Sequence, residues 1–315
     1  MKIIRDIEDL RLERSIVILG KFDGFHRGHA LLLERALQHK TADTHIVLFT
    51  FDINPSQLII GESVKTIDSR KEREKFWPER FAGFVDSIIE FPFTAQTRSM
   101  EPEEFVREIL VKRLGVCRII AGDDFHFGKG RSGDVNTLKH LGAEYGFEMD
   151  VVEKVTITLE GYTEPVEISS TLIRSEIVKG NMENVALMLV RPYGITGTVL
   201  HGKHLGTSLG FPTVNLEVPP EKLLPPAGVY YSKIHLENGE IFSGITNLGV
   251  RPSIDDGDKM SVETNIFNFS RDIYGEEITV DFIRFIRPEI KFRSFDELKS
   301  QIEHDINTIN GWNCS

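Results

Sequence analysis

Two histidines three residues apart stand in a glycine-rich stretch near the start of the chain. Residues 20–29 read GKFDGFHRGH, with Gly28 between His26 and His29. Glycines let a backbone approach phosphate closely, and imidazoles add directional hydrogen-bond donors. This pattern suits the α- and β-phosphates of ATP, where developing charge needs donors rather than a nucleophile, and it predicts direct nucleotidyl transfer. Either histidine alone could be only a helix cap, and zinc is disfavoured because no further Cys or His cluster completes a ligand set.

Length and composition limit what this stretch can belong to. At 315 residues the chain exceeds the usual single domain, so we expect two domains. A formal net charge of −11 disfavours a nucleic-acid partner, and the absence of a signal core or a long apolar run predicts a cytoplasmic protein with no membrane partner. Its two cysteines, Cys117 and Cys314, are too few for a disulfide framework or a cysteine zinc cage.

The elements of the first half place the glycine-rich stretch at a strand-to-helix turn. Ser15–Leu19 is a short apolar run before it, and Ala30–Leu37 has helical spacing after it. Further strands are predicted at 44–51, 87–91 and 116–121, with helices at 70–76 and 102–114 between them. This alternation predicts a Rossmann-like, doubly wound α/β domain, whose ligands bind at the carboxyl edge of the sheet.

The second half has a different pattern. From Tyr193 onward, β-branched and aromatic residues alternate in short runs, at 195–200, 229–236, 241–245, 262–269 and 278–286. With the hairpin signal Asn238-Gly239, they predict a small antiparallel β-barrel. Ser294 and Glu297 form a capping box for an amphipathic terminal helix over 295–309. Helices are expected at 171–179 and 182–190, and the predicted domains are residues 1–186 and 187–315.

A second motif supports the prediction of nucleotidyl transfer. Residues 20–29 resemble the nucleotidyltransferase superfamily defined by H-x-G-H, and residues 168–174, ISSTLIR, match its second triphosphate-binding segment. Hydroxyls and a helix end can cradle phosphate while the planar Arg174 fork meets charged oxygens, although Ser170 alone would pass for an N-cap. The resemblance implies that His26, His29 and Arg174 are catalytic and that ATP is bound by Gly20, Phe22, Asp23, His26, Gly28, His29, Ser170, Thr171 and Arg174.

A loop between these motifs points to a flavin. Residues 122–133, GDDFHFGKGRSG, directly follow a predicted strand and resemble the G-x-[DN]-F-x-F-G loop of bacterial FAD synthetase domains. Those domains also carry an Asn-Pro after the second strand, matched here by Asn54-Pro55. The resemblance implies that Asn54, Asp124 and Phe125 hold the flavin by polar contacts and ring packing. Without it, an ordinary surface loop is an equally good interpretation.

The barrel half carries its own phosphate motif. Residues 202–215, GKHLGTSLGFPTVN, resemble the riboflavin kinase loop that ends in P-T-A-N, and Pro212 fixes the backbone before the threonine. The resemblance implies that Thr213 and Asn215 bind Mg²⁺ and that ATP in the kinase site is bound by Gly202, Lys203, Gly210, Thr213 and Asn215. Taken alone, PTVN would be read as a turn.

An acid on a predicted barrel strand completes the pattern. In VETNIFNF (262–269), Glu263 shares a face with Phe267 and Phe269, while Val262 and Ile266 lie opposite. An acid on a strand that looks apolar on both faces would cost several kcal/mol if buried unpaired, so it needs a reason. The resemblance to riboflavin kinases makes Glu263 the catalytic base for the ribityl 5′-hydroxyl as it attacks the γ-phosphate. The alternative is an edge-strand acid facing solvent.

Together the motifs span nearly the whole chain and resemble the bacterial bifunctional riboflavin kinase/FAD synthetase family. This implies phosphorylation of riboflavin to FMN in the C-terminal domain and adenylylation of FMN to FAD, with release of diphosphate, in the N-terminal domain. ATP is the expected co-substrate and Mg²⁺ the cofactor, with riboflavin, FMN and FAD as the other small-molecule partners. Oligomeric state is not defined by the sequence.

Departures from the family pattern and two alternatives remain open at this point. Val214, Thr207, Asn265 and Ser253 stand where Ala, Arg, His and Thr are common, which affects the expected kinase rate and nucleotide affinity. The segment 247–252 and residues 274–275 also match, as scaffold that frames the flavin site.

The first alternative is an H-x-G-H transferase for another substrate. The second is a flavin-sensing regulator with degenerate active sites.

Overall fold

The computed structural model describes residues 1–52, 65–201, 211–251 and 259–312. Its internal contacts divide the chain into two compact units, Met1–Thr66 with Arg73–Ser170, and Ile67–Glu72 with Thr171–Ser315. The second unit therefore includes a short segment, 67–72, that comes from the first half of the chain. The predicted domain limits, 1–186 and 187–315, rest on the sequence patterns and stay a prediction.

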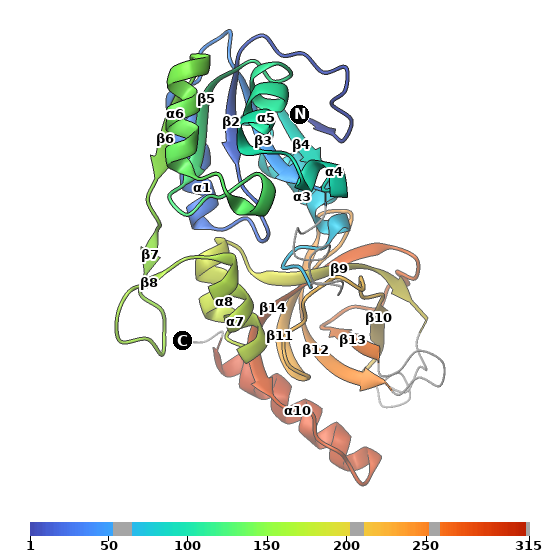
Figure 1. The fold of residues 1–315 in the computed structure, drawn as a ribbon. Coiled ribbons are helices and arrows are strands. Elements are labelled where there is room, and N and C mark those ends of the chain that lie inside the picture. Colours follow the sequence, from blue (N-terminus) through green and yellow to red (C-terminus); the bar gives the residue numbers. More distant parts are fainter. Residues whose placement is uncertain (53–64, 202–210, 252–258, 313–315) are drawn as a thin grey trace. The chain divides into compact units, whose positions relative to one another are not determined.

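The first unit is built on a parallel sheet. Among the described residues it has six strands in the order β1-β4-β3-β2-β5-β6 (Figure 1), and every neighbouring pair is parallel. Their bounds are Lys2–Ile4 (β1), Ser15–Leu19 (β2), His45–Phe51 (β3), Ser87–Phe91 (β4), Val116–Gly122 (β5) and Glu148–Val152 (β6). The predicted Rossmann-like fold is confirmed, and β1 and β6 are additional edge strands that the sequence analysis did not identify.

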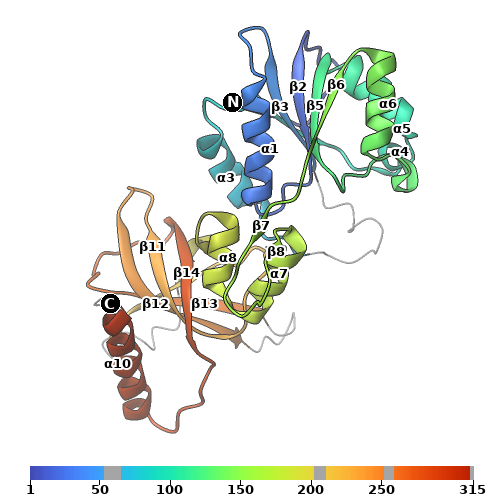
Figure 2. The ribbon, with the colours of Figure 1, turned by 90° about the vertical axis from the view of Figure 1, so that its left-hand side faces the viewer.

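Side chains alternate between the two faces of this sheet, and each face has its own apolar core. On one face, Ile16 and Ile18 of β2 pack with Leu32 of α1 (Arg27–Gln38), with Trp77 of α3 (Arg70–Arg80) and with Phe81, which directly follows α3. On the other face, strand residues of opposite parity pack against α5 (Pro102–Phe105), the π-helical segment η1 (Val106–Val111) and α6 (Val135–Tyr145). Figure 2 shows α1 and α3 on one side of the strands and α4 (Ala95–Arg98), α5 and α6 on the other. The fold is therefore doubly wound, as predicted.

The helices and short elements of the first half run between these strands. Their bounds are Arg27–Gln38 (α1), Arg70–Arg80 (α3), Ala95–Arg98 (α4), Pro102–Phe105 (α5), Val106–Val111 (η1), Lys129–Arg131 (η2), Val135–Tyr145 (α6), Thr156–Ile157 (β7) and Val166–Glu167 (β8). The helix predicted at 102–114 is present, but its middle is π-helical, an irregularity that often accompanies function and that periodicity does not reveal. Helix α3 begins in the second unit and ends in the first.

The second unit contains the predicted barrel. Its strands close in the order β10-β13-β12-β11-β14-β9, and each pairing is antiparallel. Bounds are Tyr193–Leu200 (β9), Thr213–Leu216 (β10), Gly228–His235 (β11), Ile241–Arg251 (β12), Lys259–Ile266 (β13) and Glu277–Arg287 (β14). Strand β10 was not predicted as a strand. At the predicted hairpin, only Gly239 takes positive φ, at 86°.

Among the described residues, three helices complete this unit, at Ser170–Lys179 (α7), Met182–Leu189 (α8) and Phe295–Trp312 (α10). Ile309 of α10 packs on the outer barrel residues Val229, Tyr231 and Ile245, and Asp305 of α10 forms an ion pair of 2.8 Å with Arg287. The capping box is present in modified form, because the Glu297 side chain accepts from Arg293 N–H. Within the described part of the chain, no helix is long and apolar enough to span a membrane.

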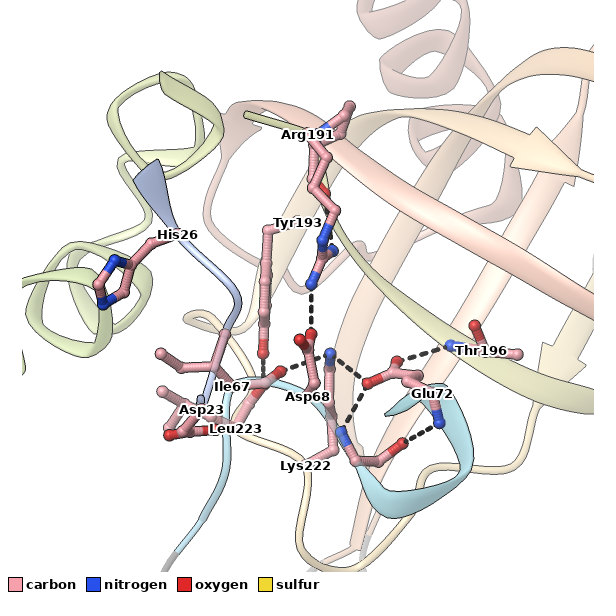
Figure 3. A network of polar contacts seen from close by, with 12 residues as sticks. Asp23, His26, Ile67, Asp68, Glu72, Arg191, Tyr193, Thr196, Lys222 and Leu223 are labelled. Atoms are coloured by element: carbon pink, nitrogen blue, oxygen red, sulfur yellow. Dashed lines mark hydrogen bonds and ion pairs between the residues drawn. The ribbon is translucent and has the colours of Figure 1, made fainter. Parts of the chain in front are cut away.

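Segment 67–72 is held in the second unit by a buried ion pair (Figure 3). Lys222 Nζ donates to the Ile67 carbonyl and to one Glu72 carboxylate oxygen, both at 2.8 Å. The other carboxylate oxygen accepts from Thr196 N–H at 3.0 Å. Ser69 N–H donates to the same carboxylate, so Glu72 also closes the capping box that starts α3. Neither charged side chain is accessible to solvent, at 0% and 3% exposure.

A second buried contact lies next to this pair. Arg191 forms an ion pair with Asp68, just before β9 begins. Val190, the residue that separates it from α8, adopts the left-handed conformation with φ 58°. A β-branched residue is rarely found there, at a cost of about 1–2 kcal/mol. The chain therefore turns sharply between α8 and the barrel, and tertiary contacts such as the Arg191 ion pair stabilise that turn.

Candidate active sites

The loop between β2 and α1 is held by its own buried aromatic side chain. Phe22 is fully buried with φ 49°, an unusual conformation for a non-glycine residue. Its ring lies over Gly20, where an added Cβ would come within 2.8 Å of a ring carbon. Thr50 Oγ1 donates to the Lys21 carbonyl at 3.0 Å and fixes the loop to β3. Such strain persists where surrounding structure imposes it, which is common at functional sites.

The two histidines cap the helix reciprocally. His26 is the N-cap of α1, and its Nδ1 accepts from His29 N–H at 3.3 Å while His29 Nδ1 accepts from His26 N–H at 3.4 Å. Their rings stack with centroids 3.6 Å apart. A Cβ on Gly28 would lie 3.1 Å from the His26 ring, so glycine lets that ring lie against the helix. These hydrogen bonds assign the ring proton of each histidine to Nε2.

Burial keeps both histidines neutral. The rings of Phe22 and Phe25 lie 5.0 and 5.6 Å from the His29 ring. Burial lowers the pKa of His26 to about 4, and the charge of Asp124 offsets part of that effect. Burial also lowers the pKa of His29 well below its usual value, with the His26 charge adding to the decrease. Near neutral pH both imidazoles are therefore uncharged, and the His29 ring also forms a hydrogen bond with the Gly24 backbone.

This pKa shift makes stability depend on pH. Between pH 6.5 and about 4, the unfolded chain protonates His26 while the folded chain resists it, so the free energy of unfolding should fall as pH falls. His26→Asn keeps an N-cap side chain but cannot titrate. Urea denaturation at about pH 7 and about pH 4.5 should therefore show a smaller loss of stability in the variant than in the parent. Equal losses of stability in parent and variant would contradict the lowered pKa of His26.

The second predicted triphosphate motif starts beside the first. Ser170 is the first residue of α7, and its hydroxyl donates to the Asp23 carbonyl in GKFDGFHRGH at 2.9 Å. The structure thus joins two segments whose proximity the sequence could only suggest. Thr171 is exposed and Arg174 half-buried on the same helix, among residues that group with the second unit. Their roles toward ATP stay a prediction.

The glycine-rich loop after β5 presents an aromatic ring on an apolar base. Phe127 is buried and its ring lies 5.8 Å from that of Phe105. The half-buried Phe125 stacks on Phe127 at 5.9 Å with the planes 16° apart. A Cβ on Gly133 would collide with the Phe127 ring at 2.7 Å, which explains that glycine. One side of Phe125 is therefore supported by protein while the side chain remains partly accessible.

The acidic residue of this loop connects it electrostatically to the histidines. Asp124 is exposed and lies 3.7 Å from Lys154 Nζ, and its charge raises the pKa of His26 against the effect of burial. The predicted flavin loop and the predicted phosphate loop therefore lie at one edge of the sheet. Asn54 is outside the described residues. The sequence analysis did not identify Lys154, because only the fold brings it to Asp124.

The residues predicted for the kinase site lie in a row across three strands. In the register of β10 and β13, Thr213 is opposite Asn265, and Asn215 is opposite Glu263. On the other side of β13, Asn247 of β12 is opposite Glu263. Directly paired residues point to the same face of a sheet, so these polar side chains share one face of the barrel. The sequence analysis treated Asn247 only as scaffold, and its place next to Glu263 could not be read without the register.

The expectation that Glu263 lies between two apolar faces was wrong. Its cross-strand neighbours are the amides Asn215 and Asn247, and its side chain is half-buried. The error arose because the strand ends at Ile266, so the later phenylalanines do not define that face. Asn265 donates from Nδ2 to the Pro212 carbonyl at 2.8 Å and holds the start of PTVN in place.

Several predicted kinase residues lie outside the described part of the chain, namely Gly202, Lys203, Thr207, Gly210 and Ser253. Of the predicted metal ligands, Thr213 and Asn215 are described, and both offer oxygen atoms on the same face as Glu263. Hard oxygen donors of this kind suit a divalent cation bound together with phosphates. No group of three or more His, Cys, Asp and Glu residues able to hold a metal occurs among the described residues.

The first unit is Rossmann-like and has an H-x-G-H helix cap, and the second is a six-stranded barrel that carries Thr, Asn and Glu in one row. This combination defines a class of phosphate-transferring enzymes with two sites. A family model described as FAD synthetase matches residues 9–171, and one described as riboflavin kinase matches residues 189–312. The chain belongs to the family of bifunctional riboflavin kinases/FMN adenylyltransferases. It converts riboflavin to FMN and FMN to FAD, using ATP.

Individual relatives match along almost the whole chain. A bifunctional riboflavin kinase/FMN adenylyltransferase from Haemophilus influenzae is 33% identical over 312 residues, covering 98% of each chain. One from Listeria monocytogenes is 35% identical over 297 residues, covering 92% of this chain and 90% of the relative. A crystal structure described as a macrolide-efflux protein from Streptococcus pneumoniae has a TM-score of 0.85 at 30% identity and covers 98% of both chains.

Proposed function

We propose that FMN is adenylylated at the His26–His29 cap. An FMN phosphate oxygen attacks the α-phosphate of ATP, the bond from that phosphorus to the bridging oxygen breaks, and diphosphate leaves. The observation that carries this proposal is the reciprocal histidine cap, which places two neutral imidazoles at the positive end of α1. Donors fixed before the reaction stabilise charge that grows in the transition state. Asp124 and Phe125 would hold the flavin at the same edge.

We also propose that riboflavin is phosphorylated at the polar row of the barrel. Glu263 would accept the proton of the ribityl 5′-hydroxyl while that oxygen attacks the γ-phosphate of ATP. Asn215 and Asn247 lie on either side of Glu263 across the strands, and their amides can orient the carboxylate. Thr213 and Asn215 would hold Mg²⁺, which neutralises phosphate charge when bound.

Family membership favours these activities over the two alternatives raised by the sequence. Both family models match, in the order that the motifs predicted. A transferase for another substrate would not explain the riboflavin kinase match over 189–312. A flavin-sensing regulator would need degenerate active sites. In this chain His26 and His29 are present in the helix cap, and Thr213 and Glu263 are present in the polar row of the barrel. A cytoplasmic location, and the absence of nucleic-acid or membrane partners, stay predictions.

Incubation with riboflavin, ATP and Mg²⁺ tests both activities at once. FMN should form first and FAD later, with separation of the flavins by chromatography as the measurement. Excess EDTA should abolish both steps, because each triphosphate needs more positive charge than the described motif side chains supply. Adding Mg²⁺ back should restore them. Flavin binding without turnover would support the sensor instead, and full activity in EDTA would contradict the metal requirement.

A further inference from the structure

An arginine from outside the recognised motifs stands next to the histidine pair. Arg80 is the last residue of α3, and its guanidinium carbon lies 4.8 Å from the centre of the Phe25 ring. Phe25 is buried and directly precedes His26. The next residue of the chain, Phe81, packs its ring 4.7 Å from that of Phe25, and its N–H donates to the Trp77 carbonyl at 3.0 Å. The Arg80 side chain therefore lies against a buried ring, and the packing of the next residue holds its backbone in place.

The charge of Arg80 reaches the phosphate-binding end of α1. It contributes to the lowered pKa of His29, which shows that the guanidinium and the imidazole are within electrostatic range. Such an arrangement disfavours a second cation and favours an anion beside the two rings. The cations within the motif itself, Lys21 and Arg27, have exposed side chains. The neutral histidines supply directional donors but no net charge of their own.

A guanidinium has the right chemistry for this place. The guanidinium carbon lies over the Phe25 ring, and the five N–H donors of the group suffice for a phosphate in addition to a protein contact. Bonds from a guanidinium to phosphate are charge-assisted and frequently bidentate. We propose that Arg80 binds the ATP triphosphate together with His29 in the adenylyltransferase site. This inference rests on the proposed assignment of that site to residues 20–29.

Arg80→Met tests the proposal because methionine keeps an apolar stem against Phe25 and removes the charge. The KM for ATP in FMN adenylylation should rise about 10- to 100-fold, the loss expected for one hydrogen bond to a charged group. Inhibition by added diphosphate should weaken by a similar factor. Arg80→Lys should recover part of the loss. Riboflavin phosphorylation by the same preparation should be unchanged, and the melting temperature should stay close to that of the parent.

Arg98→Met is the matched control, since Arg98 is exposed at the end of α4 and its loss changes the net charge equally. A purely structural role for Arg80 would lower the melting temperature of Arg80→Met and leave its KM for ATP unchanged. If Arg80→Met and Arg98→Met have the same KM for ATP, the proposal is wrong. If His29→Ala retains full adenylylation, the site assignment itself fails, and that result is distinct from a failure at Arg80 alone.

Discussion

Replacing Glu263 by glutamine is expected to slow riboflavin phosphorylation by about 10²- to 10⁴-fold, the usual contribution of a general base. The substitution keeps the size of the side chain and its place between Asn215 and Asn247, but the amide cannot accept the proton of the attacking hydroxyl. FMN supplied directly should still become FAD, because the histidine cap belongs to the other compact unit. Separate assays with riboflavin and with FMN measure the two effects.

His29→Ala provides the opposite comparison. It removes one Nε2–H donor and one half of the reciprocal cap, so adenylylation should fall by about 10² or more. FMN should then accumulate from riboflavin. Both variants should bind flavin and unfold close to the parent temperature. Loss of both activities in either folded variant would refute two independent sites and would indicate obligatory coupling between them.

The second large effect concerns the buried pair of Lys222 and Glu72. Lys222→Met leaves a carboxylate buried at 3% exposure without its cation, and Glu72→Gln leaves the buried ammonium without its anion. Breaking a buried ion pair by removing one partner typically costs about 3–5 kcal/mol, because the remaining charge is uncompensated. Each single variant should therefore lower the free energy of unfolding of the second unit by that amount. The double variant should lose much less than the sum of the two.

Unit-specific fluorescence can measure this effect. The chain has two tryptophans, Trp77 and Trp312, one in each compact unit. In a Trp77→Phe background, only Trp312 reports, and its ring lies 4.6 Å from the Arg284 guanidinium. The exposed pair of Arg271 and Glu240, 49% and 47% accessible, is the control, and Arg271→Met should leave the urea midpoint near that of the parent. If the free-energy losses of the two single variants simply add in the double variant, Lys222 and Glu72 have no coupling energy.

The elements that were best predicted from the sequence are those with a clear pattern of apolar residues. Strands such as 15–19 and 87–91 matched the structure because continuous apolar runs between helices have few alternative uses in a globular core. Strand β10 was missed since four residues, TVNL, show no useful period and follow a proline. The π-helical segment at 106–111 was also beyond prediction, because its hydrogen bonds depend on tertiary packing.

The candidate sites were predicted to the extent that their residues are contiguous. The motif around His26 and His29 could be recognised because the helix cap is local, needing only residues 20–29. Arg80 and Asn247 could not, since their positions follow from packing on Phe25 and from the register with Glu263. Segment 67–72 escaped for a related reason. In the sequence, the charged residues of this segment look like an ordinary solvated helix start. Only the fold shows that Lys222, 150 residues later in the chain, contacts Glu72.

That separation has a consequence during synthesis on the ribosome. Glu72 emerges early, whereas Lys222 follows 150 residues later, a delay of about 8–30 s at typical elongation rates of about 5–20 residues per second. Until then, we expect the first turn of α3 to be exposed and its carboxylate hydrated, while the parallel sheet of the first unit can already assemble. The barrel thus completes its fold on a segment that was translated before most of the first unit, and nascent chains arrested before Lys222 should leave residues 67–72 open to proteases.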